Sequence, residues 1–284
     1  MTRTALVLGG GGVTGIAWEL GILKGLADAG LDLTTADLVV GTSAGSVVGA
    51  NITSGRTLDS LYDAQLRPPR HEKDAHLSKL LLPMLLPAVL VPGSSRAKRA
   101  RIGRLALTAH RPGGAERIEV IRARLRMEEW PDRDLKITAV EARTGKLTVF
   151  DRESGVGIVD AVAASCAVPF VWPAVTIDDR HYIDGGVRST ANADLAKGYD
   201  VVVVLAPLPR SWSKASSIRA QLARTGAAHT AVVKPDEAAL ADIGKNVLDP
   251  GKRADAARAG LRQAPDVLEK VRSAWAVGQE TRDA

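Results

Sequence analysis

The sequence has few of the residues that cross-link a chain or hold metal clusters. Its single cysteine, Cys166, excludes an internal disulfide framework and any zinc site built from several cysteines. A chain without disulfides fits a reducing compartment, so we expect the protein in the cytoplasm. Aromatic residues make up only 4% of the sequence, and the core should therefore consist mainly of Ala, Val, Leu and Ile.

Long apolar segments are also missing. The longest apolar run covers residues 80–92, and three prolines interrupt it, so it is too short and too broken to span a bilayer. No signal peptide is visible, because Gly9 ends the apolar run that begins at Thr4. Residues 80–92 can be interpreted as a lid over an apolar cleft or as ordinary packing between short helices.

The composition that remains is that of a globular protein with an excess of basic residues. Hydrophobic residues make up 45% of the chain and charged residues 25%, and the formal net charge is +6. Much of the basic excess lies between Arg96 and Arg126. Such a stretch suits anionic lipid head groups or nucleic acid, but it also suits a solvated helical face.

Two strand–loop–helix units occupy the first 55 residues. An apolar strand over residues 4–8 enters a glycine loop, and apolar residues then recur at helical spacing from Val13 to Ala29. A second strand over residues 38–40 runs into a glycine-rich turn and a helix-compatible segment. Repeated units of this kind indicate a mainly parallel sheet covered by helices on both faces.

The second unit contains the pattern G-x-S-x-G, with Ser43 at its centre. In a strand–turn–helix setting the middle residue takes a strained conformation, and Gly41 and Gly45 lie where side chains would crowd the turn. We expect the Ser43 hydroxyl above the end of the sheet, close to helix N–H groups that can stabilise an oxyanion. The alternative is a glycine-rich turn with an incidental serine.

The glycine loop of the first unit allows several interpretations. Gly10, Gly12 and Gly15 match the dinucleotide fingerprint, but the second strand lacks the acidic residue that would hold the ribose. A phosphate-binding P-loop needs a lysine that this loop does not contain. We therefore interpret residues 9–15 as a set of backbone N–H donors, on a strand next to the serine strand, that can form an oxyanion hole.

The second half of the chain predicts a hairpin over residues 135–150 and a small-residue helix over 158–168. Cys166 lies in that helix, where a packed thiol is expected rather than a nucleophile. Residues 200–205 form the clearest buried strand. Beyond Trp212 the sequence is rich in Ala and Arg, is punctuated by prolines, and predicts helices.

Asp184 is the acid best placed for chemistry. It ends a short strand and precedes Gly185 and Gly186, so its carboxylate can reach a neighbouring group or cap a turn. A Ser-His-Asp triad would need a histidine after the acid in chain order. Only His229 follows Asp184, and it lies in an Ala-rich stretch that predicts a helix, so a packing or surface role is expected for it. His181 is expected on a strand near the site.

The glycine loop, the serine turn and the Asp184-Gly-Gly segment, with Ala163–Pro169 between the last two, resemble the patatin-like phospholipases, a family of serine lipid acyl hydrolases. The resemblance covers residues 4–207. It implies a three-layer α/β/α fold and a Ser–Asp dyad without histidine, with Ser43 as nucleophile and Asp184 as general base. It also implies an oxyanion loop at Gly10, Gly11 and Gly12, and motif glycines at Gly15, Gly41, Gly45, Gly185 and Gly186. Burial would raise the pKa of Asp184 and improve it as a base.

The glycine loop departs from the family pattern at Thr14, where the family usually has arginine. The backbone donors survive this change, whereas a positive charge that could bind an anionic head group does not. We expect a catalytic domain over residues 1–209, with a candidate lid and basic insertion at 80–112. A helical region over 210–284 is expected to pack on it.

Two functions are compatible with these features. The first is hydrolysis of acyl lipids or phospholipids through an acyl-serine, at the surface of an anionic membrane and without a cofactor or metal. The second is a non-catalytic protein that binds anionic lipid or nucleic acid on the same scaffold, which the basic excess and Thr14 favour. No specific nucleic-acid partner is expected. A nicotinamide-dependent enzyme is disfavoured because the ribose-binding acid is missing.

Overall fold

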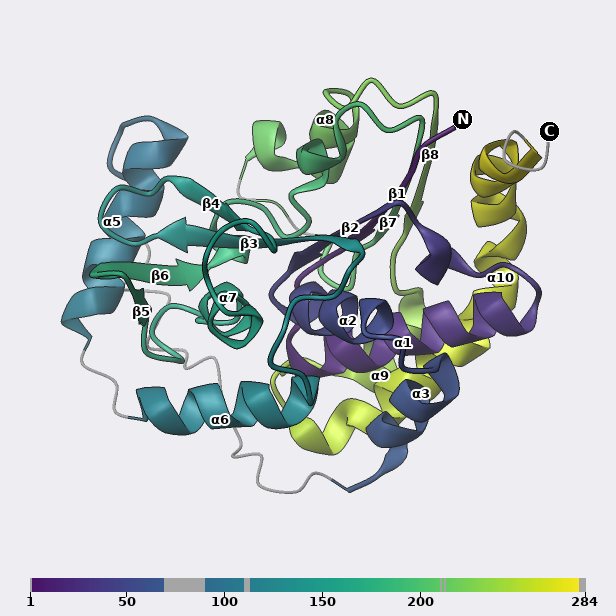
Figure 1. Ribbon diagram of the computed structural model, residues 1–284, viewed down its shortest axis with the longest axis horizontal. Coiled ribbons are helices and arrows are strands. Elements are labelled where there is room, and N and C mark those ends of the chain that lie inside the picture. Colours follow the sequence, from purple (N-terminus) through teal and green to yellow (C-terminus); the bar gives the residue numbers. More distant parts are fainter. Residues whose placement is uncertain (1, 69–89, 110–112, 210, 212, 281–284) are drawn as a thin grey trace.

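The computed structural model describes residues 2–68, 90–109, 113–209, 211 and 213–280, with side chains described as far as Trp275. These residues form a central β-sheet with helices on both of its faces (Figure 1). The candidate lid over residues 80–92 lies largely outside them. Only its last residues are described, and there the Leu90 and Val91 side chains are exposed.

The described strands form a single sheet in the order β5-β6-β3-β2-β1-β7-β8, and β4 pairs with β3 outside this path. Pairing is parallel from β3 through β2, β1 and β7 to β8, and antiparallel where β4, β5 and β6 join. The predicted mainly parallel sheet is therefore confirmed. The strands are β1 Thr4–Leu8, β2 Leu38–Thr42, β3 Asp134–Glu141, β4 Leu147–Phe150, β5 Val175–Ile177, β6 Arg180–Asp184, β7 Val201–Leu205 and β8 His229–Val233.

Alternating side chains of the central strands are buried on both faces of the sheet. In β1, Leu6 and Leu8 belong to the larger apolar cluster, whereas Ala5 and Val7 belong to a smaller one on the opposite face. Helices α1, α2, α7 and α10 cover the larger cluster, and α8 with short helical turns covers the other (Figure 1). The helices are α1 Gly12–Asp28, α2 Ala44–Thr53, α3 Leu58–Leu66, α5 Ser95–Thr108, α6 Gly114–Leu125, α7 Ile158–Ser165, α8 Ile218–Leu222, α9 Glu237–Ile243 and α10 Arg253–Glu280.

Strand β3 changes its partner along one edge, and this change creates the site. Thr138 is paired with Thr42 of β2, and the next residue, Ala139, is paired with Asp184 of β6. Strand β4 pairs with both Thr138 and Ala139, so it occupies the opposite edge. Strands β2 and β6 therefore meet end to end beside β3, and the carboxyl ends of both strands lie next to each other.

The C-terminal region contains a strand that the sequence reading did not predict. Residues 229–233 form β8, which pairs in parallel with β7, so the helical assignment of His229 was wrong. Ala231 and Val233 are buried and alternate with more exposed neighbours, which is a strand pattern. It extends over only five residues and is therefore a weak signal in the sequence. Pro265 likewise does not end a helix but lies inside α10.

Helix α10 packs along α1 at backbone distance. A Cβ atom on Gly21 would lie 2.2 Å from the Ala257 carbonyl oxygen, and one on Gly260 would lie 2.3 Å from the Trp18 carbonyl oxygen. The Trp18 indole N–H also donates to Gln263 Oε1 at 3.0 Å. This contact joins the C-terminal region to the first strand–loop–helix unit.

Replacing Gly21 with Ala is expected to lower the free energy of unfolding by about 1–3 kcal/mol, because the added methyl group forces the two helices apart. Urea unfolding followed by circular dichroism measures this loss. Gly114→Ala on α6 is the matched control, since its Cβ would meet nothing nearer than Pro173 Cγ at 3.8 Å. The control should be neutral or up to about 1 kcal/mol more stable. Equal stability of the two variants would contradict the close helix contact.

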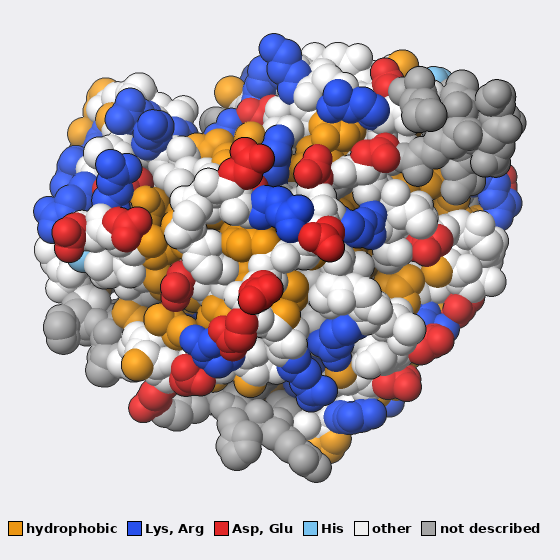
Figure 2. All heavy atoms as spheres, viewed as in Figure 1, with side chains coloured by type: hydrophobic (Ala, Val, Ile, Leu, Met, Phe, Trp, Pro, Cys, Tyr) orange, Lys and Arg blue, Asp and Glu red, His pale blue; other side chains and the backbone are white. Residues whose placement is uncertain are grey.

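The basic helix α5 uses several of its arginines within the fold. Arg96, Arg99 and Arg104 donate to the carbonyl oxygens of Thr144, Gly145 and Arg143, all in the turn between β3 and β4. Figure 2 shows Lys and Arg side chains on the side of the molecule where α5 lies, interspersed with Asp and Glu elsewhere on that face. Part of the basic excess therefore holds a turn in place.

Candidate active site

Ser43 lies on the sharp turn between β2 and α2. Its φ is +52°, in the region that L-residues rarely adopt, and only 8% of its surface is exposed to solvent. A Cβ on Gly45 would lie 2.1 Å from the Leu8 carbonyl oxygen, and one on Gly41 would lie 2.5 Å from Ser46 Cα. The two glycines are therefore required for the turn to pack against β1 and α2, as the motif predicts.

The backbone of Ser43 is fixed from two helices. Its N–H donates to Ser165 Oγ at 2.9 Å, and its carbonyl oxygen accepts from Ser46 Oγ at 2.6 Å and from Cys166 Sγ at 3.3 Å. Burial, as the main cause, raises the pKa of the Cys166 thiol to about 11, so the thiol is neutral at pH 7. Cys166 thus packs against the turn and supports the strained conformation of Ser43.

Asp184 ends β6 directly beside this turn. It is 5% exposed, and its Oδ1 accepts the Gly186 N–H at 2.7 Å. Burial raises the pKa of Asp184 to about 6, and hydrogen bonds from the Ser43 side chain and from Gly186, together with the charge of Arg117, oppose this rise. The structure therefore places the Ser43 side chain next to the buried Asp184 carboxylate. A Cβ on Gly185 would lie 2.4 Å from Thr138 Oγ1, so that position also needs glycine.

The glycine loop lies against Ser43. A Cβ on Gly10 would be 3.5 Å from Ser43 Cβ, and the Gly45 N–H donates to the Gly9 carbonyl oxygen at 3.0 Å. The Gly10 N–H is already donated to the Thr190 carbonyl oxygen at 2.7 Å. Within the described residues, the N–H groups of Gly11 and Gly12 at the start of α1 have no hydrogen-bond acceptor. These two N–H groups are therefore the available donors of the loop.

Thr14, the departure from the family pattern, anchors this loop to the C-terminal region. Its N–H and its Oγ1 both lie 3.2 Å from the Val247 carbonyl oxygen, and Oγ1 also contacts the Gly11 carbonyl oxygen at 3.4 Å. Gly12 has a φ of +62°, and a Cβ there would lie 2.4 Å from the Val247 carbonyl oxygen. The Val247 carbonyl group thus lies directly against the loop, held there by Thr14.

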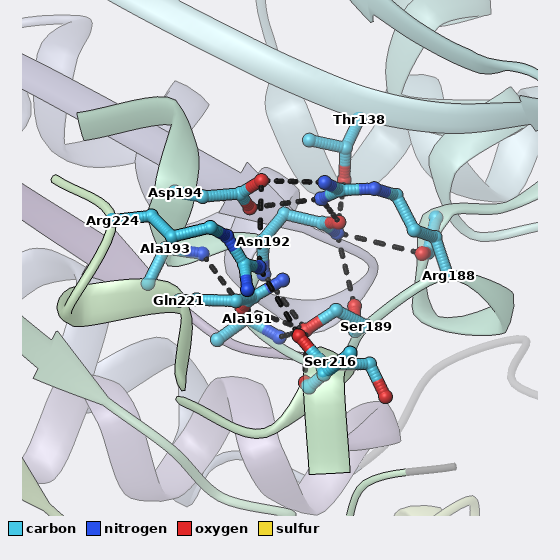
Figure 3. Close-up of polar contacts among 12 residues, drawn as sticks. Thr138, Arg188, Ser189, Ala191, Asn192, Ala193, Asp194, Ser216, Gln221 and Arg224 are labelled. Carbon is cyan, nitrogen blue, oxygen red and sulfur yellow. Dashed lines mark hydrogen bonds and ion pairs between the residues drawn. The ribbon is translucent and has the colours of Figure 1, made fainter. Parts of the chain in front are cut away.

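A buried polar network joins the strand ends that carry Ser43 and Asp184 (Figure 3). At its centre is Asn192, fully buried at a φ of +53°. Its Nδ2 lies 3.1 Å from Thr42 Oγ1, 3.3 Å from Thr138 Oγ1 and 3.4 Å from the Gly185 carbonyl oxygen. The three partners come from β2, from β3 and from the turn after β6. One amide thus ties together the three segments that place the candidate dyad.

The amide of Asn192 is itself oriented by an ion pair. Arg188 Nη1 donates to Asn192 Oδ1 at 2.7 Å, and the same guanidinium pairs with both carboxylate oxygens of Asp194 at 2.9 and 2.5 Å (Figure 3). Both charged side chains are 19% exposed. The Arg188 contacts, chiefly its hydrogen bonds, hold the pKa of Asp194 below its usual range against the opposing effect of burial. Neither Asn192 nor this pair was predicted from the sequence.

The described residues contain neither a cluster suited to a metal ion nor a helix suited to spanning a membrane. No group of three or more His, Cys, Asp or Glu side chains that could hold a metal ion occurs in the part of the chain that the structure describes. Within the same residues, no helix combines the length and the apolar character needed to cross a membrane. His181 lies on β6 as expected, with its Nδ1 3.0 Å from Thr176 Oγ1.

The fold and the site define an α/β protein whose candidate site residues gather at the carboxyl ends of neighbouring strands, where such sheets bind their ligands. The chain belongs to the patatin-like phospholipase family, whose sequence profile matches residues 6–197. The family resemblance and the three-layer fold expected from the motifs are therefore confirmed.

Solved structures similar to this chain include VipD from Legionella pneumophila, with 11% identity and a TM-score of 0.48 over 95% of this chain and 67% of VipD. The type III effector protein ExoU is 18% identical, with a TM-score of 0.42 over 95% of this chain and 53% of ExoU. A complex of SpcU with ExoU from Pseudomonas aeruginosa gives 17% identity and a TM-score of 0.39, with 53% of ExoU covered. The chain thus spans about two thirds of VipD and about half of ExoU.

Proposed function

We propose that the protein is a lipid acyl hydrolase of the phospholipase A or esterase type, with Ser43 as nucleophile and Asp184 as general base. The observation that carries this proposal is the position of the Ser43 side chain, on its strained turn, next to the buried Asp184, whose pKa is raised to about 6. A base with a pKa near neutrality is better matched to a serine hydroxyl than an exposed aspartate. Membership of a phospholipase family supports the same reading.

Asp184 accepts and then returns one proton in each half of the reaction. In the first half, Asp184 takes the Ser43 proton while Oγ attacks the ester carbonyl carbon, and the N–H groups of Gly11 and Gly12 stabilise the oxyanion. Protonated Asp184 then gives its proton to the departing alkoxide, which leaves an acyl-serine. In the second half, Asp184 deprotonates a water that attacks the acyl-serine. The Ser43 alkoxide recovers the proton, and the fatty acid is released.

The proposed substrate is an acyl lipid or phospholipid, and the proposed place of reaction is the cytoplasm, at the surface of an anionic membrane. The buried, unpaired thiol of Cys166 agrees with a reducing compartment. Arginines of α5 that remain at the surface, such as Arg101 and Arg104, could contact anionic head groups while donating to backbone carbonyls. No cofactor enters the proposed chemistry.

Labelling with a fluorophosphonate probe tests the proposal, because such probes react covalently only with an activated serine. We expect the folded protein to be labelled within minutes, with the adduct on the peptide that contains Ser43 and with release of fatty acid from phospholipid vesicles. Heat-unfolded protein is the control for non-specific reaction. A folded protein that is not labelled, but that binds anionic vesicles or DNA in a salt-dependent way, would replace the hydrolase with a binding protein.

A further inference from the structure

A pocket of about 360 Å³ is lined mainly by residues of α1, α2, α3 and α6. This volume is in the range of small-molecule sites. Its wall is largely apolar and is formed by Val13, Ile16, Leu20, Val47, Val48 and Leu61. The pocket accordingly suits a flexible hydrocarbon chain.

Ser43 and Asp184 do not line this pocket, but residues close to Ser43 in the fold do. Val47 lies one helical turn after Ser43, with its N–H 3.4 Å from the Ser43 carbonyl oxygen, and Val13 directly follows the available donor Gly12. The lining then continues along α2 as far as Asn51. A chain attached to Ser43 Oγ can therefore run along α2 through the pocket.

The end of the pocket remote from Ser43 is positively charged. Arg56, Arg124 and Arg126 line it together with Asn51. Arg253, which contacts Ala64 and Gln65 of α3, also lines the pocket, and Glu119 is the acidic residue of the lining. Arg56 Nη1 donates to Asn51 Oδ1 at 2.6 Å, and the Asn51 amide contacts the Arg124 carbonyl oxygen at 3.4 Å.

Two of these guanidinium groups have their charge uncompensated. Among the described residues, neither Arg56 nor Arg126 forms an ion pair with a carboxylate. Burial and the nearby charge of Arg126 both lower the pKa of Arg56, so the two cations lie close enough to repel. Neighbouring like charges are unfavourable unless an anion lies between them.

The distance between Ser43 and this end sets the size of the ligand. Asn51 lies eight positions after Ser43 along α2, which corresponds to about 12 Å at 1.5 Å per residue. An extended chain advances roughly 3.5 Å for every three single bonds, so about ten bonds cover this distance.

We propose that the pocket binds the acyl chain of the substrate and that Arg56 and Arg126 bind a negatively charged group, such as a carboxylate, about ten bonds from the scissile carbonyl. The inference rests on the proposed function and specifies its substrate class. Guanidinium groups suit a carboxylate because they donate two hydrogen bonds in a fixed geometry.

Two esters that differ only at the chain end test this proposal: 4-nitrophenyl decanoate and the mono-4-nitrophenyl ester of decanedioic acid. The wild type should hydrolyse the carboxylate-ended ester with a kcat/KM about tenfold higher, mainly through KM, as one charge-assisted hydrogen-bond contact allows. Arg56→Gln and Arg126→Gln should each bring the ratio of the two kcat/KM values close to one, by lowering the value for the carboxylate-ended ester. Because Arg126 is exposed, we expect Arg126→Gln to fold, and this variant alone still tests the proposal if Arg56→Gln does not fold.

Arg67→Gln is the matched control, since it removes the same charge from an exposed position outside the pocket lining, and it should keep the preference. Equal rates on the two esters would overturn the inference while leaving the hydrolase intact. A second result would also overturn it. If Arg56→Gln and Arg126→Gln abolish a preference for phosphatidylglycerol over phosphatidylcholine vesicles, but do not change the preference between the two esters, the anion that these arginines bind is the head group. Hydrolysis of neither ester, with no fluorophosphonate labelling, would count against the proposed function itself.

Discussion

The Asp184→Asn variant is expected to lose about three orders of magnitude in kcat/KM for ester hydrolysis while becoming more stable at pH 8. Asparagine keeps the shape of the side chain and can still accept the Gly186 N–H, but it cannot take the proton of Ser43. A positioned general base contributes about 10²–10⁴-fold to such reactions. Steady-state kinetics on 4-nitrophenyl butanoate and calorimetric melting measure the two effects on the same preparation.

The gain in stability follows from the pKa of Asp184. Burial is the main cause that raises this pKa from 3.8 to about 6. Between these two values the folded protein binds more protons than the unfolded chain, so stability falls as the pH rises through this window. About two pKa units correspond to a cost on the order of 3 kcal/mol at higher pH. Neutral asparagine removes the cost, so lower activity together with a higher melting temperature excludes unfolding as the cause of the loss.

The same pKa predicts the acid limb of the pH profile. Only ionised Asp184 can accept the Ser43 proton, so kcat/KM of the wild type should fall tenfold per pH unit below about 6 and level off above it. The residual activity of Asp184→Asn should lack this limb. Asp134→Asn, at an exposed position on β3, is the control and should change neither rate nor profile. A wild-type rate in Asp184→Asn would remove Asp184 from the mechanism.

Much of the fold could be predicted because the decisive signals are local. The turn at Ser43 needs glycines at fixed offsets, and the helix after each strand repeats its apolar residues at a fixed period, so a few residues define each element. Strand β8 was missed because its five residues have neither a turn motif nor a long periodic pattern. Pairing with β7 is what makes them a strand. Pro265 is one of the prolines that punctuate the C-terminal region, and it lies inside α10, which tertiary packing keeps helical through it.

The network behind the site could not be predicted for a different reason. Thr42, Thr138 and Asn192 are each about fifty residues or more apart in the sequence, and only the change of partner along β3 brings them together. The sequence pattern identifies residues whose backbone setting is unusual, such as Ser43. It carries no signal for a side chain whose role is to join three strand ends, apart from the tolerance of Asn for a positive φ.

Replacing Asn192 with Ala is expected to lower the free energy of unfolding by about 3 kcal/mol and the rate of fluorophosphonate labelling by about 10-fold to 100-fold. The stability loss has two causes. The Arg188 donor that Oδ1 accepts is left without this partner in a buried site, and alanine tolerates a φ of +53° less well than asparagine. The loss of reactivity has a separate cause. Without Nδ2, no side chain joins Thr42 to Gly185, and small displacements of a nucleophile from its base lower the rate by large factors.

Two further variants separate these causes. Asn192→Gly removes the amide but accommodates the positive φ, so it should label as slowly as Asn192→Ala while recovering about 1 kcal/mol of stability. Asp179→Ala changes an exposed residue with a φ of +61°, and it should lose about the same 1 kcal/mol without any change in labelling. Labelling at the wild-type rate in Asn192→Gly, measured well below its melting temperature, would mean that the sheet alone holds Ser43 against Asp184. Slow labelling of both Asn192 variants, with Asp179→Ala unaffected, would assign the alignment of the dyad to one buried amide.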